Sequence, residues 1–248
     1  MSRKHDHLLS RKGATRTADI PAEVLEALNS GAISTVNLTE WLMVDNLKLL
    51  DVVLKAEKQS ALFKSVSDAV AALKKPTVNS VQYAISTTLR AAAGKDEKKI
   101  YALLSSHPSD SVRCWAAYYV GTDSSKTLEQ KLELIEPLAA DLHFGVREVA
   151  WLAVRPALAA ELSKALILLK PWTPSSDANI RRFTSEATRP RGVWCAHITE
   201  LKEKPELALH LLEPLRSDSS EYVRNSVANW LNDASKTQPK WVQETCKR

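Results

Sequence analysis

Apolar residues recur at intervals of three and four positions along most of the chain, the spacing that places them on one face of an α-helix. The pattern is present in PAEVLEALNSG, from about residue 38 to residue 55, and near residues 59–75 and 79–94. Only 6 glycines occur in 248 residues, and Ala, Leu, Glu and Lys are abundant. Because a many-stranded fold requires more Gly turns than this, the sequence predicts an all-α protein.

A repeat organises the second half of the chain. Four strings align, SVRCWAAYYVG, GVREVAWLAVR, NIRRFTSEATR and YVRNSVANWLN, each with a β-branched residue followed by arginine. The arginines are separated by 34, 34 and 43 residues, and they are Arg113, Arg147, Arg181 and Arg224. A proline lies ten residues before each of the last three arginines, within LIEPL, LLKPW and LLEPL.

Each repeat unit reads as a first helix that ends near its proline, a short polar turn, and a second helix that carries the arginine. Two helices in roughly 34–47 residues are typical of HEAT and armadillo repeats. We therefore predict a right-handed α-solenoid of HEAT-like helix pairs with a concave binding face. Its expected parts are a basic N-terminal arm (1–20) and a single repeat domain (21–248) with divergent helices (21–95), clear repeats (about 97–236) and a terminal helix (239–247).

Counting 100° per residue from each arginine separates two faces of the second helices. Offsets −1, +3, +6 and +7 are mostly apolar and predict the core: Val112, Ala116, Tyr119 and Val120; Val146, Ala150, Ala153 and Val154; Ile180, Thr184, Ala187 and Thr188; Val223, Val227, Trp230 and Leu231. Offsets +1, +5 and +8 lie opposite and, from the second copy onward, are mostly polar: Glu148, Leu152 and Arg155; Arg182, Glu186 and Arg189; Asn225, Asn229 and Asn232.

The polar offsets have two interpretations. They can form a solvated face stabilised by ion pairs such as Arg182 with Glu186, which are four residues apart. They can also bind DNA, because second helices of a solenoid line one surface and arginine and asparagine suit phosphate and base contacts. We favour DNA binding, with these expected contacts from the repeats: Arg155, Arg182, Arg189, Arg191, Asn225 and Asn229.

The positive charges are clustered, although the net charge of +5 is modest. Residues 1–17 contain five basic residues against the single acid Asp6, and Arg11, Lys12 and Arg16 are the expected DNA contacts of a basic arm. A solvated tail with no role is the alternative.

Several other classes of protein find no support in the sequence. No apolar run reaches the roughly 20 residues that cross a bilayer, and no secretory signal is present, so we expect a cytoplasmic, nucleoid-associated protein and no membrane partner. The three cysteines form no C-x-x-C pair and the six histidines have no metal-ligand spacing. We expect no metal, no cofactor and a monomer.

Tryptophans divide into two groups. Trp115, Trp172 and Trp230 are expected in the core, whereas Trp194 follows the basic string ATRPRGVW, in which Pro190 should end a helix. Exposed indole and arginine planes form a stacking platform for nucleobases or sugars, so we expect Trp194 to be exposed.

Three strings resemble segments of the bacterial DNA alkylation repair proteins of the AlkC and AlkD superfamily. They are AVRPAL (153–158), FTSEATRPRGVW (183–194) and EYVRNSVANWLNDASK (221–236), and the resemblance extends over roughly residues 110–240. It implies a monofunctional DNA glycosylase that acts on double-stranded DNA carrying purines alkylated at N3 or N7. Such purines are cationic leaving groups, so the resemblance implies a carboxylate and aromatic faces that stabilise positive charge on the deoxyribose.

The resemblance transfers four catalytic candidates. Glu186 and Trp194 match an acidic residue and a tryptophan that lie near the lesion. Trp151 occupies the position of the principal carboxylate, and Glu148, one helical turn earlier on the same side, is the candidate replacement. Ion pairing of Glu148 with Arg147, Arg155 or a neighbouring repeat, and of Glu186 with Arg182 or Arg189, is the alternative for each carboxylate.

Three functions remain open at this point. They are an alkylpurine DNA glycosylase, a non-catalytic paralogue that binds damaged or branched DNA, and a protein-interaction scaffold. The polar residues at offsets +1, +5 and +8 argue against a protein-interaction scaffold, because such a scaffold would present apolar contact residues on this face.

Overall fold

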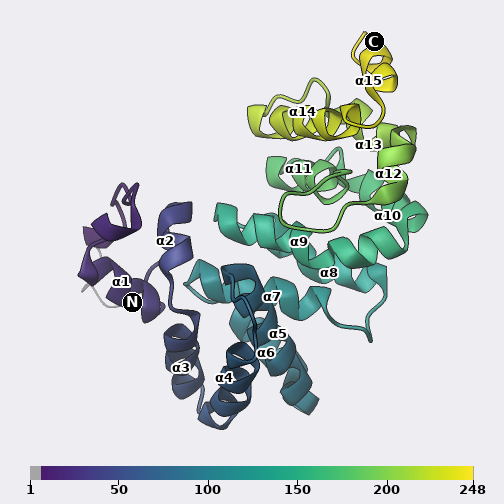
Figure 1. The fold of residues 1–248 in the computed structure, drawn as a ribbon. Coiled ribbons are helices and arrows are strands. Elements are labelled where there is room, and N and C mark those ends of the chain that lie inside the picture. Colours follow the sequence, from purple (N-terminus) through teal and green to yellow (C-terminus); the bar gives the residue numbers. More distant parts are fainter. Residues whose placement is uncertain (1–6, 248) are drawn as a thin grey trace. The chain divides into compact units, whose positions relative to one another are not determined.

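A computed structural model describes residues 7–247 of the chain, and all regular structure in that range is helical, which confirms the all-α prediction. Contacts divide the chain into two compact units, Met1–Asp123 and Ser124–Arg248. The helices of each unit are labelled in Figure 1. The prediction of a single repeat domain over residues 21–248 stays a prediction.

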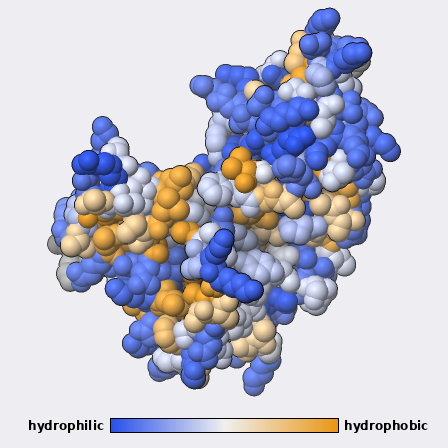
Figure 2. All heavy atoms as spheres, viewed as in Figure 1, coloured by the Kyte–Doolittle hydropathy of each residue, from blue (hydrophilic) through white to orange (hydrophobic). Residues whose placement is uncertain are grey.

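The first unit contains seven α-helices among its described residues. They are α1 (Ala22–Asn29), α2 (Leu38–Met43), α3 (Asn46–Ala56), α4 (Phe63–Ala71), α5 (Val78–Ala93), α6 (Glu97–Ser105) and α7 (Asp110–Gly121). Helices α5 and α7 pack side by side, with α4 against α5 and α6 against α7. The surface around α2 is apolar (Figure 2), and its exposed residues include Leu38, Leu42 and Met43.

The segment from residue 7 to residue 20 is packed, which differs from the expected basic arm. Leu8 and Ile20 are buried. The Arg11 guanidinium donates to both oxygens of the buried Glu40 carboxylate at 2.9 and 2.6 Å and to the carbonyl of Ser34 at 2.6 Å. Arg11 is therefore a structural residue, because its donors are already used inside the fold. Residues 1–6 of the predicted arm lie outside the described range.

The second unit stacks the remaining helices in two layers (Figure 1). One layer contains α9 (Phe144–Ala160), α11 (Ala178–Ala187) and α14 (Glu221–Ser235), with α11 packed against both neighbours. The first helices of the repeats pack against this layer, and they are α8 (Leu128–Ala139), α10 (Leu162–Leu169), α12 (Thr199–Glu203) and α13 (Leu209–Leu212). The terminal helix α15 (Pro239–Thr245) packs on α14.

The predicted core positions of the second helices are buried, except that Leu231 is half-buried. Trp115 and Trp230 are fully buried, whereas Trp172 is half-buried against Phe183, with 5.1 Å between ring centroids. A period of 3.6 residues therefore identified the buried face in all four copies.

The repeated arginine clamps the turn before its own helix. In every copy one guanidinium nitrogen, Nη1, donates to the carbonyls six and five residues earlier: from Arg113 to His107 and Pro108, from Arg147 to Asp141 and Leu142, from Arg181 to Ser175 and Ser176, and from Arg224 to Asp218 and Ser219. The side chain six residues before the arginine also accepts the backbone N–H two residues further on, as Asp141 does from His143. The repeat thus satisfies backbone groups that a tight interhelical turn would leave unpaired.

Candidate functional site

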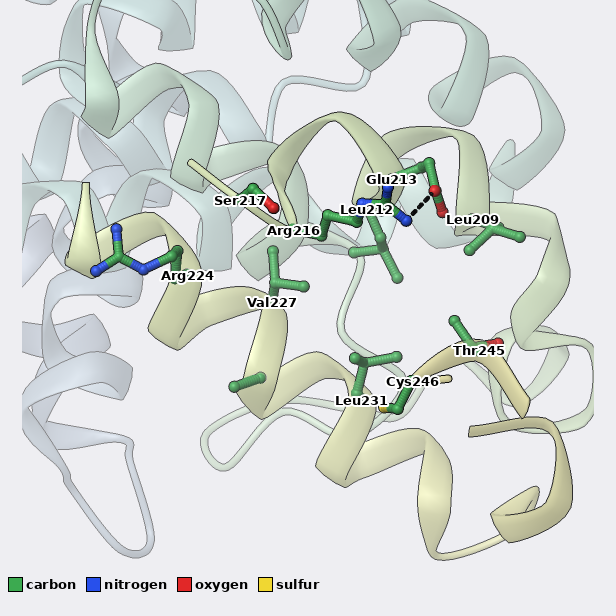
Figure 3. A pocket seen from close by; sticks show the side chains of 11 residues that line it. Leu209, Leu212, Glu213, Arg216, Ser217, Arg224, Val227, Leu231, Thr245 and Cys246 are labelled. Carbon is green, nitrogen blue, oxygen red and sulfur yellow. Dashed lines mark hydrogen bonds and ion pairs between the residues drawn. The ribbon is translucent and has the colours of Figure 1, made fainter. Parts of the chain in front are cut away.

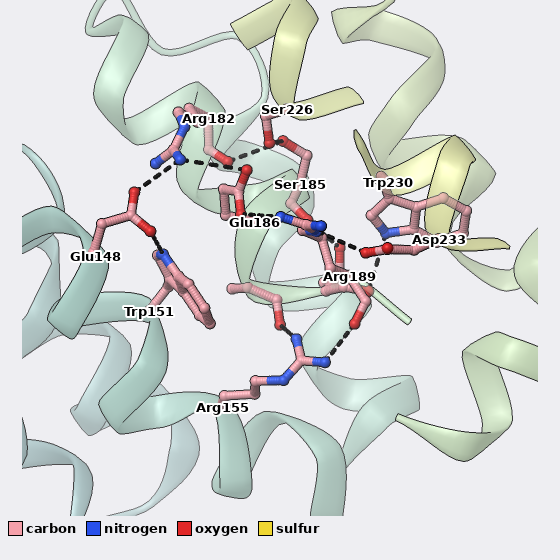
Figure 4. A network of polar contacts seen from close by, with 12 residues as sticks. Glu148, Trp151, Arg155, Arg182, Ser185, Glu186, Arg189, Ser226, Trp230 and Asp233 are labelled. Atoms are coloured by element: carbon pink, nitrogen blue, oxygen red, sulfur yellow. Dashed lines mark hydrogen bonds and ion pairs between the residues drawn. The ribbon is translucent and has the colours of Figure 1, made fainter. Parts of the chain in front are cut away.

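A chain of ion pairs crosses helices α9, α11 and α14 in the second unit (Figure 4). Arg182 Nη2 lies 2.8 Å from Glu148 Oε1 and 3.3 Å from Glu186 Oε1. Arg189 continues the chain, with Nη1 3.3 Å from Glu186 Oε2 and Nε 2.8 Å from Asp233 Oδ2. Four residues of the predicted polar face, Glu148, Arg182, Glu186 and Arg189, therefore form one connected network, which includes the Arg182–Glu186 ion pair of the alternative interpretation.

Glu148 is the accessible carboxylate of this network, because its side chain is 39% exposed. One of its oxygens pairs with Arg182, and the other accepts the Trp151 indole N–H at 3.0 Å. Glu148 and Trp151 are three residues apart on α9, so the helix itself brings them together. Trp151 is buried, which fixes the direction from which the indole donates.

Glu186 lies inside the network. Its side chain is 3% exposed, and its two oxygens face Arg182 and Arg189. Both arginines are themselves mostly buried, so neither points freely into solvent. Burial opposes charge on Arg189, but its bonds to Asp233 and Glu186 outweigh burial and raise its pKa. Glu186 is therefore placed to hold two guanidiniums together rather than to face a ligand.

Arg155 corrects an expectation, because the sequence assigned it to DNA. It is buried, and its guanidinium donates to the carbonyls of Ala187 at 2.8 Å, Ala196 at 3.3 Å and Arg189. Burial lowers its pKa. Since its donors are used by backbone carbonyls, Arg155 cannot also bind a phosphate without breaking these bonds.

The loop that Arg155 holds, residues 188–198, carries two exposed apolar side chains. Val193 is 76% and Trp194 is 68% exposed, as expected for the tryptophan. The Ile198 N–H donates to the Pro190 carbonyl at 3.1 Å and closes the base of the loop. Arg191 in this loop is half-buried, and its Nε atom has no hydrogen-bond partner within the described part of the chain.

The other predicted DNA contacts remain at the surface. Asn225 and Asn229 are exposed on α14, next to the ion-pair network. Lys12 and Arg16 are exposed in the first unit, where Arg16 pairs with Asp19 at 2.7 Å.

Sequence reasoning missed two members of the site, Asp233 and Tyr222. Asp233 is nine residues after Arg224, 180° around α14, and so lies outside the offsets counted as the polar face. Tyr222 lies in the first turn of α14, and the Arg182 guanidinium carbon sits 4.2 Å from its ring centroid. No periodicity signalled this contact, because it joins α11 to α14.

A separate groove of about 480 Å³ lies between α13, α14 and α15 (Figure 3). Leu209, Leu212, Val227 and Leu231 form its apolar part. At its rim Arg216 pairs with Glu213 at 2.7 Å, and Arg224 is the turn-clamping arginine of its copy. It brings together no acid and aromatic pair comparable to Glu148 and Trp151, so the network is the candidate site.

Part of the second unit is similar to a known family. Residues 145–245, which contain the whole ion-pair network, match the family model described as DNA alkylation repair enzyme. The match covers less than half of the chain. The matched segment includes Glu148, Arg182 and Asp233.

Solved structures have a fold similar to that of this chain. The Pseudomonas fluorescens alkylpurine DNA glycosylase AlkC, bound to DNA containing an abasic site analog, has a TM-score of 0.65 at 24% identity over 95% of this chain and 60% of that chain. AlkD2 from Streptococcus mutans has a TM-score of 0.59 at 26% identity over 75% of this chain and 89% of that chain. These similarities confirm the predicted HEAT-like fold class.

A curated sequence relative is the Bacillus subtilis protein named "Uncharacterized protein YhaZ". It is 46% identical over 87 residues, which are 35% of this chain and 24% of that protein. The chain thus spans about a quarter of that relative and 60% of the AlkC chain.

Within the described residues no three or more His, Cys, Asp and Glu side chains gather in an arrangement that could hold a metal ion. No helix in the same range is long and apolar enough to cross a membrane.

Proposed function

We propose that this protein is a monofunctional DNA glycosylase that hydrolyses the N-glycosidic bond of cationic N3- or N7-alkylated purines in double-stranded DNA. The observation that carries the proposal is the Glu148 carboxylate, which is partly exposed and fixed by Arg182 and the Trp151 indole in the segment that matches the DNA alkylation repair enzyme model. A preorganised carboxylate of this kind stabilises positive charge that develops near it.

The reaction needs little acid catalysis. The bond between C1′ of deoxyribose and the purine nitrogen breaks, and the alkylated base leaves with the bonding electrons as a neutral molecule. Positive charge then builds on the sugar, where Glu148 stabilises it and accepts a hydrogen bond from the attacking water. Water adds its oxygen to C1′ and releases one proton to solvent, leaving an abasic site.

The neighbouring residues have distinct roles in this proposal. Trp151 orients Glu148 through its indole N–H. Trp194 offers an exposed ring on which a base or sugar can stack. Asn225, Asn229 and Arg191 contact the DNA from the second unit, and Lys12 and Arg16 from the first. We further propose a cytoplasmic, nucleoid-associated monomer.

The test is release of free base from methylated duplex DNA by purified protein. Wild type should release 3-methyladenine or 7-methylguanine, and Glu148→Gln should reduce the single-turnover rate by roughly 10²-fold, the usual scale for losing one electrostatic stabiliser. Affinity for duplex DNA should hold or improve, because removing a negative charge reduces repulsion of phosphate. A Glu148→Gln protein with the wild-type rate would show that another group stabilises the sugar.

A second candidate is a non-catalytic paralogue that binds damaged or branched DNA. The specific observation in its favour is that Trp151 stands where the resemblance places the principal carboxylate, and that Arg182 already pairs with Glu148. This function predicts no base release from either methylated purine, together with tighter binding to branched or abasic duplexes than to intact duplex.

A further inference from the structure

The Tyr222 ring contacts two guanidinium groups that come from different helices. The Arg182 guanidinium carbon is 4.2 Å from the ring centroid, and that of Arg147 is 5.3 Å from it. Both distances are within the range at which the ring quadrupole attracts a cation. Tyr222 is half-buried in the first turn of α14, so these contacts tie α14 to α9 and α11.

Arg147 also contacts Tyr222. Its Nη1 atom is held by the carbonyls of Asp141 and Leu142, as in every copy of the repeat. Its Nε and Nη2 atoms both donate to the Tyr222 hydroxyl at 3.4 Å. At this distance the two hydrogen bonds are weak, so the place of Tyr222 in the first turn of α14, rather than its hydroxyl, sets the position of the ring.

The orientation of the Arg182 guanidinium in turn depends on the Tyr222 ring. Its side chain is 12% exposed, and a single nitrogen, Nη2, faces both Glu148 and Glu186. A guanidinium that faces two carboxylates can rotate between them, or turn outward to a DNA phosphate, unless something fixes its plane. The Tyr222 ring supplies that constraint, because attraction to the ring face holds the guanidinium carbon over the ring, 4.2 Å from its centroid.

We propose that Tyr222 is a positioning residue: by stacking on Arg182 it keeps that arginine on Glu148 and away from phosphate, and so fixes the carboxylate toward the sugar. The proposal rests on the glycosylase function above. It also changes the predicted role of Arg182, which acts as the counter-charge of Glu148 rather than as a DNA contact. The order of dependence runs from Tyr222 through Arg182 to Glu148.

The experiment compares Tyr222→Leu with Tyr222→Phe. Phe keeps the ring face for Arg182 and removes only the hydroxyl, whereas Leu removes the ring. Single-turnover excision should fall about tenfold in Tyr222→Leu, as expected for losing a cation–π contact at a partly desolvated site, with affinity for duplex DNA unchanged within about twofold. Tyr222→Phe should excise within about threefold of wild type.

A second measurement does not depend on activity. The Arg182 guanidinium carbon lies over the Tyr222 ring, 4.2 Å from its centroid, so ring current should shift the guanidinium N–H proton resonances of Arg182 upfield in ¹H–¹⁵N spectra of wild type, with the assignment made from Arg182→Lys. The shift should persist in Tyr222→Phe and disappear in Tyr222→Leu. Because wild type itself gives the signal, the test holds even if Tyr222→Leu does not fold.

The outcomes separate the two proposals. If wild type releases no base, the glycosylase proposal fails, and the Arg182 resonance alone decides whether Tyr222 positions that arginine. An unshifted Arg182 resonance in wild type overturns the positioning role. So does an excision rate in Tyr222→Leu equal to wild type, or a loss of DNA affinity in that variant as large as its loss of rate.

Discussion

Glu148 and Glu186 belong to one ion-pair network but differ in what they can do for a bound molecule. The Glu148 side chain is 39% exposed, and that of Glu186 is 3% exposed between two arginines. A carboxylate that a ligand cannot reach contributes through the groups it holds, whereas an accessible one can act on the ligand itself. Exposure therefore makes Glu148 the catalytic candidate and Glu186 a structural residue, although both are acidic residues on neighbouring second helices.

Glu186→Gln tests the structural role. The amide keeps the volume but leaves the two mostly buried guanidiniums of Arg182 and Arg189 without their shared counter-charge. We expect the free energy of unfolding to fall by about 3 kcal/mol, the scale for breaking a buried pair by removing one partner. Urea denaturation at neutral pH measures this loss.

Glu148→Gln is the matched control in the same denaturation experiment. Because Glu148 is more exposed, its loss should lower the free energy of unfolding by roughly 1 kcal/mol or less. Equal losses in the two variants would contradict the division of roles between these carboxylates.

At the scale of elements, the clamping arginines do more than close their own turns. Arg181 reaches from α11 to Asp218 in the turn before α14, with Nε 2.6 Å from Oδ2 and Nη2 2.7 Å from Oδ1. The hydrogen bond from Arg181 is the main cause of a lowered pKa for Asp218. This pair joins two successive repeats, while the hydrogen bonds of Arg224, in the last copy, go to its own turn among residues 7–247.

Arg181→Met should therefore destabilise the protein more than Arg224→Met at pH 7. We expect losses of about 2 kcal/mol and about 1 kcal/mol in the free energy of unfolding, because Arg181 loses a bidentate charged pair as well as two carbonyl bonds. A group whose folded pKa is depressed contributes stability that is complete above its unfolded pKa.

The difference between Arg181→Met and Arg224→Met should thus shrink as the pH falls below the ordinary Asp218 value of 3.8 and through its lower folded value. Urea denaturation of wild type and both variants between pH 7 and pH 3 measures it. A difference that stays constant over this range would mean that the Asp218 carboxylate contributes nothing to the effect.

The packing of the helices and loops also explains which features the sequence pattern could not predict. A period of 3.6 residues gives the direction of each side chain around its helix, and it identified the core face and the repeat. It does not show what covers the opposite face. Arg155 pointed correctly away from the core, yet the loop of residues 188–198 lies over it and takes its donors. Trp194 was predictable because Pro190 marks the end of a helix, whereas Tyr222 needed the packing of α11 on α14.

For the whole molecule, the N-terminal segment is part of the first unit. Deleting residues 2–17 removes Leu8 from the core and leaves the buried Glu40 carboxylate without Arg11. We expect the free energy of unfolding to fall by about 3 kcal/mol or more, with a lower melting temperature in calorimetry. An unchanged melting temperature would restore the original interpretation as a detached arm.

The double variant Lys12→Gln, Arg16→Gln is the matched control for this deletion. Both side chains are exposed, so the melting temperature should not change. Affinity for duplex DNA should fall, and the fall should diminish with added salt if the two charges contact phosphate. Unchanged affinity at low salt would exclude them from the DNA contacts.

The arginine clamp affects which positions of the repeat can vary in sequence. It binds backbone carbonyls, which every residue provides, so most side chains of the turn are free to vary. The four turns, HPSDS, DLHFG, SSDAN and DSSEY, share a first side chain that accepts a backbone hydrogen bond and otherwise have little in common. An alignment based on the turns alone would therefore miss the repeat, which the arginine outside the turn reveals.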